Sequence, residues 1–411
     1  MTEQTNTPEL RFPEFKGEWE EKKLGDTGVF RKSYSFSRAK EGEGIYRHIH
    51  YGDIHSKLPE IVYDNNLLPQ IKENKDFVKV QKGDLIFADA SEDYDDLGKA
   101  ITLDFNPQNI IAGLHTHLFT LEKNYDNKFL VNYTKTNKYR TFIRKVGTGI
   151  SVLGISKKSL SNFNILTPFI DEQEKIGDFF SKLDRQIELE EEKLELLEQQ
   201  KRGYMQKVFS QELRFKDEKD DYYSDWENYQ LKDLTYYKNG KGYEKVATTN
   251  GKYNIINLNS VGVKGQLKDS GKYTDFEDDT LLKNDLIMIL SDVAKGNLIG
   301  MTAIIDENNK YLLNQRIALL RIENPLITNA YFLYLYINFN RKYFINMSTG
   351  MSQLNINKKT VEDFPVNLPN IEEQNKIAIL FKNYEDNIKK QASKVKLLKQ
   401  RKKGLLQKMF V

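Results

Sequence analysis

The chain has 411 residues, a length that predicts about two to three compact domains. Hydrophobic residues make up 39% of it, as in folded globular proteins, and the absence of cysteine excludes disulfides, thiolate metal sites and cysteine nucleophiles. The net charge is only +3, no segment approaches the roughly 18 apolar residues of a membrane span, and residues 1–12 lack the apolar core of a signal peptide. We therefore expect a cytoplasmic protein that makes no membrane contact.

The first predicted elements, from about residue 20 to 165, are short strands joined by irregular loops. An apolar run follows Lys82 and Gly83, and residues 109–122 alternate between apolar and polar, as residues 312–323 do later in the chain. This pattern predicts an α+β fold. Neither GxGxxG nor GxxxxGK[ST] is present, which disfavours a doubly wound nucleotide-binding fold.

From Glu172 the apolar spacing changes to that of a long helix. Ten positions spaced alternately by four and three residues run from 176 to 208, and all but Glu190 and Lys201 are apolar. Five heptads without proline predict a coiled coil of roughly 37 residues rather than a surface helix on a sheet.

The second half of the chain repeats the first at an offset of 201 residues. Residues 149–158 and 350–359 share six identities, and the match continues without a gap through the second long helix, which begins at Glu373. Earlier in each half the match is looser: ELRF at 9–12 recurs at 212–215, and the offset drifts up to 207. We therefore expect an internal duplication with pseudo-two-fold symmetry, in which residues 9–12 supply the ELRF segment that follows the first helix but not the second.

The two predicted helices carry opposite charge. Residues 172–207 contain seven basic and ten acidic side chains, whereas residues 373–408 contain eleven basic and three acidic ones. Because matching seams of opposite charge favour pairing, we expect the helices to pair antiparallel within the chain. Their centres, near residues 192 and 393, should lie opposite each other, with one group of glutamates near one group of lysines: Glu190, Glu191, Glu192 and Glu195, and Lys389, Lys390, Lys394 and Lys396.

These motifs carry a family resemblance. Each half is introduced by a segment like ELRFPEFKGEWEEKKLGD, and it closes with P-x-x-x-EQ-x-KI and a long helix ending in G-x-x-QK-x-F. The whole chain resembles the specificity subunit of Type I restriction-modification enzymes. The resemblance implies two target-recognition domains, at 1–165 and 212–366, each recognising one half of a bipartite asymmetric site in double-stranded DNA. The conserved helices, at 166–211 and 367–411, would form the antiparallel coiled coil that spaces the domains.

The resemblance also implies partners. The helices would dock two modification (methyltransferase) subunits, and restriction (motor and nuclease) subunits would join through the complex. This chain would be non-catalytic and bind no cofactor or metal of its own, with S-adenosylmethionine, ATP and Mg held by the partner subunits. The sequence agrees so far as it contains no [ND]-P-P-[YF] tetrapeptide, Walker motif or HExxH. The acidic segment 275–283 distantly resembles a nuclease site, but a solvated loop is the favoured interpretation.

Two loops at equivalent positions, 30–38 and 237–245, mix basic, aromatic and small polar residues. Such a mixture suits phosphate and base-edge contacts, although solvated loops also have it. The candidate DNA-binding residues are in these loops and on the strands that follow them: Arg31, Lys32, Tyr34, Ser35, Arg38, His48, His50, Lys238, Lys241, Tyr243, Lys245, Asn257 and Asn259.

All five histidines are in the first half. On a strand, His48 and His50 would share a face, which makes a metal site conceivable. The second half has Ile255 and Asn257 instead, so a structural or base-contacting role is favoured over a metal.

Other repeated features have less specific interpretations. Residues 148–151 and 349–352, TGIS and TGMS, suit backbone contacts to DNA or a structural turn, and we favour the turn. Gly203 and Gly404 lie inside the helices, where glycine costs about 1 kcal/mol, so we expect a close approach by a partner or by the opposite helix. A coiled-coil scaffold without DNA and a free-standing DNA-binding regulator stay as alternative functions.

Overall fold

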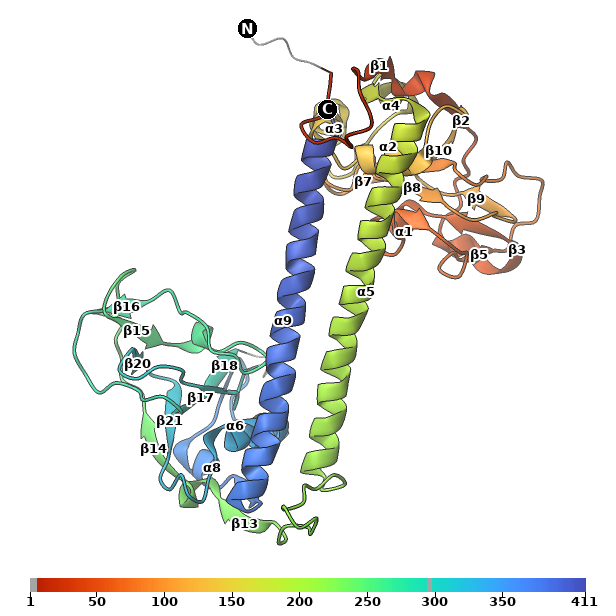
Figure 1. Ribbon diagram of the computed structural model, residues 1–411. Coiled ribbons are helices and arrows are strands. Elements are labelled where there is room, and N and C mark those ends of the chain that lie inside the picture. The colour runs from red at the N-terminus through yellow and green to blue at the C-terminus, as the bar shows by residue number, and fades with distance from the viewer. Residues whose placement is uncertain (1–5, 294–297) are drawn as a thin grey trace. The chain divides into compact units, whose positions relative to one another are not determined.

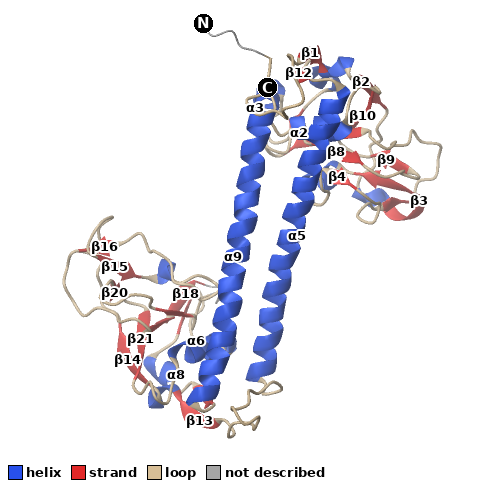
Figure 2. Ribbon diagram, viewed as in Figure 1, coloured by secondary structure: helices blue, strands red, loops and turns tan. Residues whose placement is uncertain are grey.

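A computed structural model describes residues 6–293 and 298–411. The chain divides into two compact units, here called unit 1 (Met1–Lys193 with Gln391–Val411) and unit 2 (Leu194–Lys390). Both combine helices and strands (Figure 2), which confirms the α+β prediction. Each unit contains part of both long helices. The domain boundaries from the sequence treat each helix as a separate segment, and they stay a prediction. No helix in the described part of the chain has the length and apolarity needed to span a membrane.

Unit 1 is built on one five-stranded and one three-stranded sheet, of order β2-β10-β6-β8-β4 and β5-β3-β9. Two short pairs, β1-β12 and β11-β7, complete it. Its strands are β1 (Glu20–Lys23), β2 (Gly28–Arg31), β3 (Glu41–Ile49), β4 (Ile61–Val62), β5 (Gln70–Ile71), β6 (Leu85–Ala88), β7 (Ala90–Ser91), β8 (Ala100–Leu103), β9 (Ile110–Ala112), β10 (Thr116–Leu121), β11 (Leu153–Gly154) and β12 (Asn164–Thr167). Its helices are η1 (Leu24–Asp26), η2 (Arg38–Lys40), α1 (Tyr51–Ser56), α2 (Asn127–Tyr133), α3 (Asn137–Val146) and α4 (Lys157–Ser161), followed by the start of α5 (Ile170–Phe209).

Unit 2 repeats this plan with a four-stranded sheet, β14-β21-β17-β19, and a three-stranded sheet, β16-β15-β20. The short pairs β13-β23 and β18-β22 correspond to those of unit 1. Its strands are β13 (Glu227–Gln230), β14 (Thr235–Asn239), β15 (Tyr253–Ile256), β16 (Tyr273–Thr274), β17 (Leu286–Ile289), β18 (Ser291–Val293), β19 (Thr302–Ile304), β20 (Tyr311–Leu313), β21 (Ile317–Ile322), β22 (Gln353–Asn355) and β23 (Pro365–Leu368). Its helices are η3 (Leu231–Asp233), η4 (Leu258–Ser260), α6 (Ala330–Phe339), α7 (Lys342–Met347) and α8 (Lys358–Glu362), followed by α9 (Ile371–Met409).

The two units therefore share one topology, which confirms the internal duplication. The order of the shared strands is the same in both main sheets, and in both three-stranded sheets the central strand pairs antiparallel with one neighbour and parallel with the other. Unit 1 differs by the extra edge strand β4 and by helix α1, in whose place unit 2 has the single turn η4.

Each core is completed by the end of a long helix from the other half of the sequence. In unit 1, Phe410 at the end of α9 packs against Trp19 and Phe129, and Leu406 and Met409 are buried in the same cluster. In unit 2, Val208 near the end of α5 is fully buried in the corresponding cluster. Figure 1 shows the last turn of α9 beside α3, and the Asn137 N–H donates to Gln407 Oε1 at 3.1 Å.

The chain ends meet as the repeat predicts. The backbone N–H of Leu10 donates to the Lys408 carbonyl at 2.8 Å, and the N–H of Leu213 donates to the Lys207 carbonyl at 2.9 Å. The two bonds are equivalent in the two copies. The ELRF segment at 9–12 thus caps the second long helix as the segment at 212–215 caps the first.

The antiparallel pairing of the helices is visible within each unit. In unit 1, Gln391 Nε2 donates to the carbonyl and to Oε2 of Glu190, at 2.8 and 2.7 Å. In unit 2, Lys201 Nζ lies 2.7 Å from Glu385 Oε1. Lys402 pairs in the same way with Asp184 in unit 1. The polar residues that interrupt the apolar seam are therefore paired across it.

The predicted charge pairing is confirmed in part. Glu190 pairs with Lys394 at 2.5 Å, as expected. Glu191, however, reaches Lys399 at 2.5 Å, which is not among the four lysines that the prediction named. The prediction was wrong there because long flexible side chains can reach partners away from the facing position.

A charge-reversal series tests this pairing. Changing Glu190 and Glu191 to lysine is expected to lower the melting temperature by a few degrees, because each new lysine faces another cation. Changing Lys394 and Lys399 to glutamate in the same chain should restore most of it, as measured by circular dichroism. The second set alone is the matched control and should destabilise as the first does. A double set no more stable than either single set would contradict the pairing.

Candidate nucleic-acid interface

The repeated EQ motif fastens each domain to its long helix. In unit 1, Glu172 accepts two hydrogen bonds of 2.7 Å from Arg11 of the ELRF segment. Gln173 donates to the Pro168 carbonyl at 2.8 Å and accepts from the N–H of Asp126 at 3.1 Å. Both side chains are buried at the start of α5. These bonds join the start of α5 to the ELRF segment and to Asp126, which gives the motif a structural role.

Unit 2 uses the same bonds. Glu373 accepts from Arg214 at 2.8 Å twice, and from the N–H of Phe215 at 3.1 Å. Gln374 donates to the Pro369 carbonyl at 2.7 Å and accepts from the Asn329 N–H at 2.8 Å. The framework that carries each set of loops is therefore the same in the two domains.

In unit 1 the candidate residues of the first loop separate into three environments. Arg31, at the end of β2, lies 3.6 Å from the buried carboxylate of Asp84. Tyr34 packs in a small aromatic cluster with Phe36 and Phe77, and its hydroxyl accepts from the N–H of Val78 at 2.8 Å. Lys32 and Ser35 are exposed. Among the described ion pairs, none joins Lys32 to a carboxylate, and its ammonium lies over the ring of Tyr34. Lys32 is thus the exposed candidate cation of this loop.

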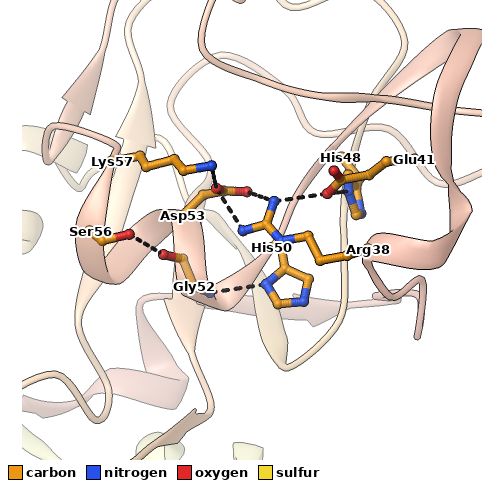
Figure 3. Close-up of polar contacts among 8 residues, drawn as sticks. All are labelled: Arg38, Glu41, His48, His50, Gly52, Asp53, Ser56 and Lys57. Carbon is orange, nitrogen blue, oxygen red and sulfur yellow. Dashed lines mark hydrogen bonds and ion pairs between the residues drawn. The ribbon is translucent and has the colours of Figure 1, made fainter.

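Arg38 belongs to a polar cluster around Asp53 (Figure 3). It makes a bidentate contact with the fully buried Asp53, at 2.8 and 3.0 Å, and a further bond of 2.8 Å with Glu41. Burial raises the pKa of Asp53, but the bonds from Arg38 outweigh this effect, and the net pKa is lowered. Part of the donor capacity of Arg38 is therefore used inside the protein.

The two histidines of this cluster are buried. His48 Nε2 lies 3.1 Å from Glu41 Oε1, and His50 Nδ1 accepts from the Gly52 N–H at 3.1 Å. Burial and the neighbouring Arg38 charge lower the pKa of His50 to about 4, so it is neutral at physiological pH. His48 lies on β3 whereas His50 caps α1, so the expected shared strand face is wrong. No group of three metal-ligating side chains occurs in the described ranges.

In unit 2 three candidates line one groove. Lys238, Lys241 and Tyr243 border an open cavity of about 420 Å³, together with Asp278 and Asp279. Lys238 pairs with Asp279 at 2.7 Å and Lys241 with Asp278 at 2.6 Å. The structure thus brings the basic loop 237–245 against the acidic segment 275–283.

Asp278 and Asp279 line this groove, although the sequence analysis does not name them as candidates. The sequence favours a solvated loop for the acidic segment 275–283, which resembles a nuclease site only distantly. The negative charge of this segment is opposite to that of the lysine-rich loop in the same half of the chain, and this complementarity is the feature of the sequence that indicates a contact. Only the fold shows that these two segments, about 40 residues apart, face each other.

The other candidates in unit 2 lie apart from this groove. Asn257 caps η4, its Oδ1 accepting from the Asn259 N–H at 2.8 Å. Lys245 and Asn259 are exposed. These positions stay candidate contacts without an assigned partner.

The TGIS and TGMS segments are turns. Thr148 and Gly154 exchange backbone hydrogen bonds, as Thr349 and Asn355 do in unit 2. Gly149 has φ of 132°, and a Cβ there would lie 2.0 Å from the Val152 carbonyl oxygen. The favoured structural interpretation is therefore confirmed.

The structure excludes one of the two reasons expected for the helix glycines. A Cβ on Gly203 or Gly404 would meet no atom of the described structure within 4 Å. Close approach of the opposite helix is thus not the reason for either glycine. Contact with a partner stays a prediction.

The chain is similar to known proteins along most of its length. Residues 16–199 and 223–399 match the family described as Type I restriction modification DNA specificity domain. Two relatives come from Methanocaldococcus jannaschii. The type I restriction enzyme MjaX specificity subunit is 23% identical over 335 residues, covering 78% of this chain and 76% of that protein. The MjaVIII specificity subunit is 22% identical over 309 residues, covering 72% of each.

Solved structures share the fold. The crystal structure of a Type I restriction-modification S subunit from M. genitalium has a TM-score of 0.61 at 15% identity, over 98% of this chain and 99% of that one. A structure from work on assembly and conformational transition of the type I R-M system has a TM-score of 0.53 at 14% identity, over 94% and 96%.

Proposed function

The chain belongs to the Type I restriction modification DNA specificity domain family, and from this premise we propose that each domain recognises one half of a bipartite, asymmetric DNA target. The chain is a DNA sequence-recognition subunit with two domains. The observation that carries the division into half-sites is the contrast between framework and loops. The EQ and ELRF contacts are the same in both units, whereas the loops at 30–38 and 237–245 have different side chains and different surroundings.

A duplicated framework with diverged loops suits an asymmetric target. Two identical domains would favour a palindrome, because symmetric proteins match symmetric sites. Domains that share a fold but differ in their loops can recognise unrelated half-sites. The helices α5 and α9, of 40 and 39 residues, would set the number of base pairs between the half-sites.

The chemistry would belong to partner subunits. Two modification subunits would dock on the long helices, and restriction subunits would join through the complex. The duplication supports a pair of like partners, because two copies of one plan would offer each partner a similar surface. S-adenosylmethionine, ATP and Mg²⁺ would be bound by these partners, and this chain would contribute recognition without catalysis.

A domain exchange tests the proposal. Residues 20–165 are replaced by the corresponding segment of a relative with a known target, and the complex with the modification subunit methylates a plasmid library. Sequencing of the methylated sites should show the donor's half-site in place of one half, with the other half unchanged. Exchange of residues 226–348 is the matched control and should change only the other half. Changes in both halves would overturn modular recognition. Methylation without sequence preference would instead favour the alternative that the chain is a coiled-coil scaffold.

A further inference from the structure

The same position in the two domains holds two different chemistries. The N–H of Tyr34 donates to the Ala112 carbonyl at 2.9 Å, and the N–H of Lys241 donates to the Leu313 carbonyl at 3.0 Å. Ala112 and Leu313 end the equivalent strands β9 and β20. Tyr34 and Lys241 are therefore structurally equivalent, although they differ completely in polarity.

Their partners differ in the same way. Val80 and Leu281 donate equivalent backbone bonds, to the carbonyls of Ile110 and Tyr311. Three residues before each of them, unit 1 has Phe77 and unit 2 has Asp278. The ring of Phe77 packs edge-on against Tyr34 at 4.8 Å, whereas Asp278 forms the 2.6 Å ion pair with Lys241. The position that holds an aromatic contact in unit 1 thus holds an ion pair in unit 2, where it borders an open groove.

The groove in unit 2 presents both charges to solvent. Lys241 and Asp279 are exposed at its rim, with 52% and 76% of their side-chain surface accessible. The bond from Lys241 and the N–H of Asp279 hold the pKa of Asp278 at about 2, so this carboxylate is ionised at physiological pH. The groove is lined by two carboxylates, Asp278 and Asp279, and by the cations Lys238, Lys241 and Arg321. A ligand that carries both hydrogen-bond donors and acceptors matches this lining better than a phosphate, which brings acceptors alone.

Base edges in the major groove of DNA have this combination. A G·C pair presents the N4 amino group of cytosine as donor and the O6 and N7 atoms of guanine as acceptors. Aspartate accepts from cytosine N4, and lysine donates to guanine O6 and N7. Thymine in place of cytosine would set its O4 acceptor against the carboxylate, which is repulsive.

We propose that this groove recognises a G·C base pair in the half-site of the second domain, with Asp278 accepting from cytosine and Lys241 donating to guanine. The inference rests on the proposed function and names the residues that give that domain its specificity. Tyr243 is a positioning residue in this arrangement. Its side chain is buried, and its hydroxyl donates to Asp278 Oδ2 at 3.0 Å, which orients the carboxylate toward the groove.

The test compares Asp278→Asn and Lys241→Ala with the unchanged chain, each in complex with the modification subunit. Methylated sites from a random DNA library are sequenced. The unchanged complex should require G·C at one position of one half-site, and both variants should lose about tenfold in discrimination at that position alone. Lys310→Ala is the matched control, because Lys310 pairs with Glu307 at 2.5 Å in the same domain without lining the groove. It should leave the site unchanged.

Three results would overturn the inference. The first is an unchanged site in both groove variants that fold with normal melting temperature, and the second is an equal loss of methylation across all sequences, as expected of phosphate contacts. The third is a change in the half-site assigned to the first domain. The proposed function fails separately, if the unchanged complex methylates DNA without a bipartite preference.

Discussion

Arg214→Ala is expected to destabilise unit 2 by about 3–5 kcal/mol, because it leaves a buried carboxylate without its cation. The side chain of Glu373 is fully buried and that of Arg214 only 13% exposed. After the substitution Glu373 still accepts hydrogen bonds from the N–H of Phe215 and from Trp226 Nε1, at 3.1 and 3.3 Å. It has lost its cationic partner, however, and stays a buried negative charge. The chain has two tryptophans, one in each unit, so Trp226 fluorescence in a Trp19→Phe background follows unfolding of unit 2 in denaturant.

Two controls make this prediction specific. Lys216→Ala removes an exposed ion pair with Asp220 from the same region and should cost less than about 1 kcal/mol. Glu373→Gln in the Arg214→Ala background should recover part of the loss, because it removes the uncompensated charge and keeps an acceptor for Phe215. Equal effects of Arg214→Ala and Lys216→Ala would contradict a structural role for the EQ motif.

Periodic and repeated features of the fold could be predicted from the sequence. The apolar seam of each long helix is a local property, and Ile176 and Phe180 are buried as their spacing requires. The antiparallel pairing follows from the repeat, because a pseudo-two-fold axis between the two halves runs the two equivalent helices in opposite directions. The partners of individual charges could not be predicted in the same way. Long flexible side chains choose among several neighbours, as Glu191 does with Lys399.

The candidate site was predictable only in outline. The two loops lie at equivalent positions in the two units, as the repeat predicts, but their composition does not show which side chains reach solvent. Tyr34 and Phe36 turned out to pack against Phe77, a residue far away in the sequence. The contact of Asp278 with Lys241 becomes visible only when the fold brings two distant segments together. Recognition sites of this kind depend on loop conformation, which a single sequence does not determine.

Phe410→Ala is expected to destabilise unit 1 by about 3–5 kcal/mol, although the residue lies next to the end of the chain. Its ring is only 6% exposed and lies 5.1 Å from Phe129, 5.4 Å from Tyr133 and 5.9 Å from Phe180. It also packs edge-on against Trp19 at 6.3 Å. Trp19 fluorescence in a Trp226→Phe background therefore reports the loss of this packing and the unfolding of unit 1.

The effect should be confined to the unit whose core Phe410 completes. Phe209 is its counterpart in unit 2, where it packs against Phe332 and Tyr336. Phe209→Ala should therefore shift the unfolding transition reported by Trp226 more than the one reported by Trp19. Phe169→Ala removes a phenylalanine that is 87% exposed and should change neither transition. If Phe410→Ala left the Trp19 transition unchanged, the end of the second helix would not be part of the first domain's core. A reciprocal result for the two phenylalanines would mean that each domain folds around the helix contributed by the other half of the sequence.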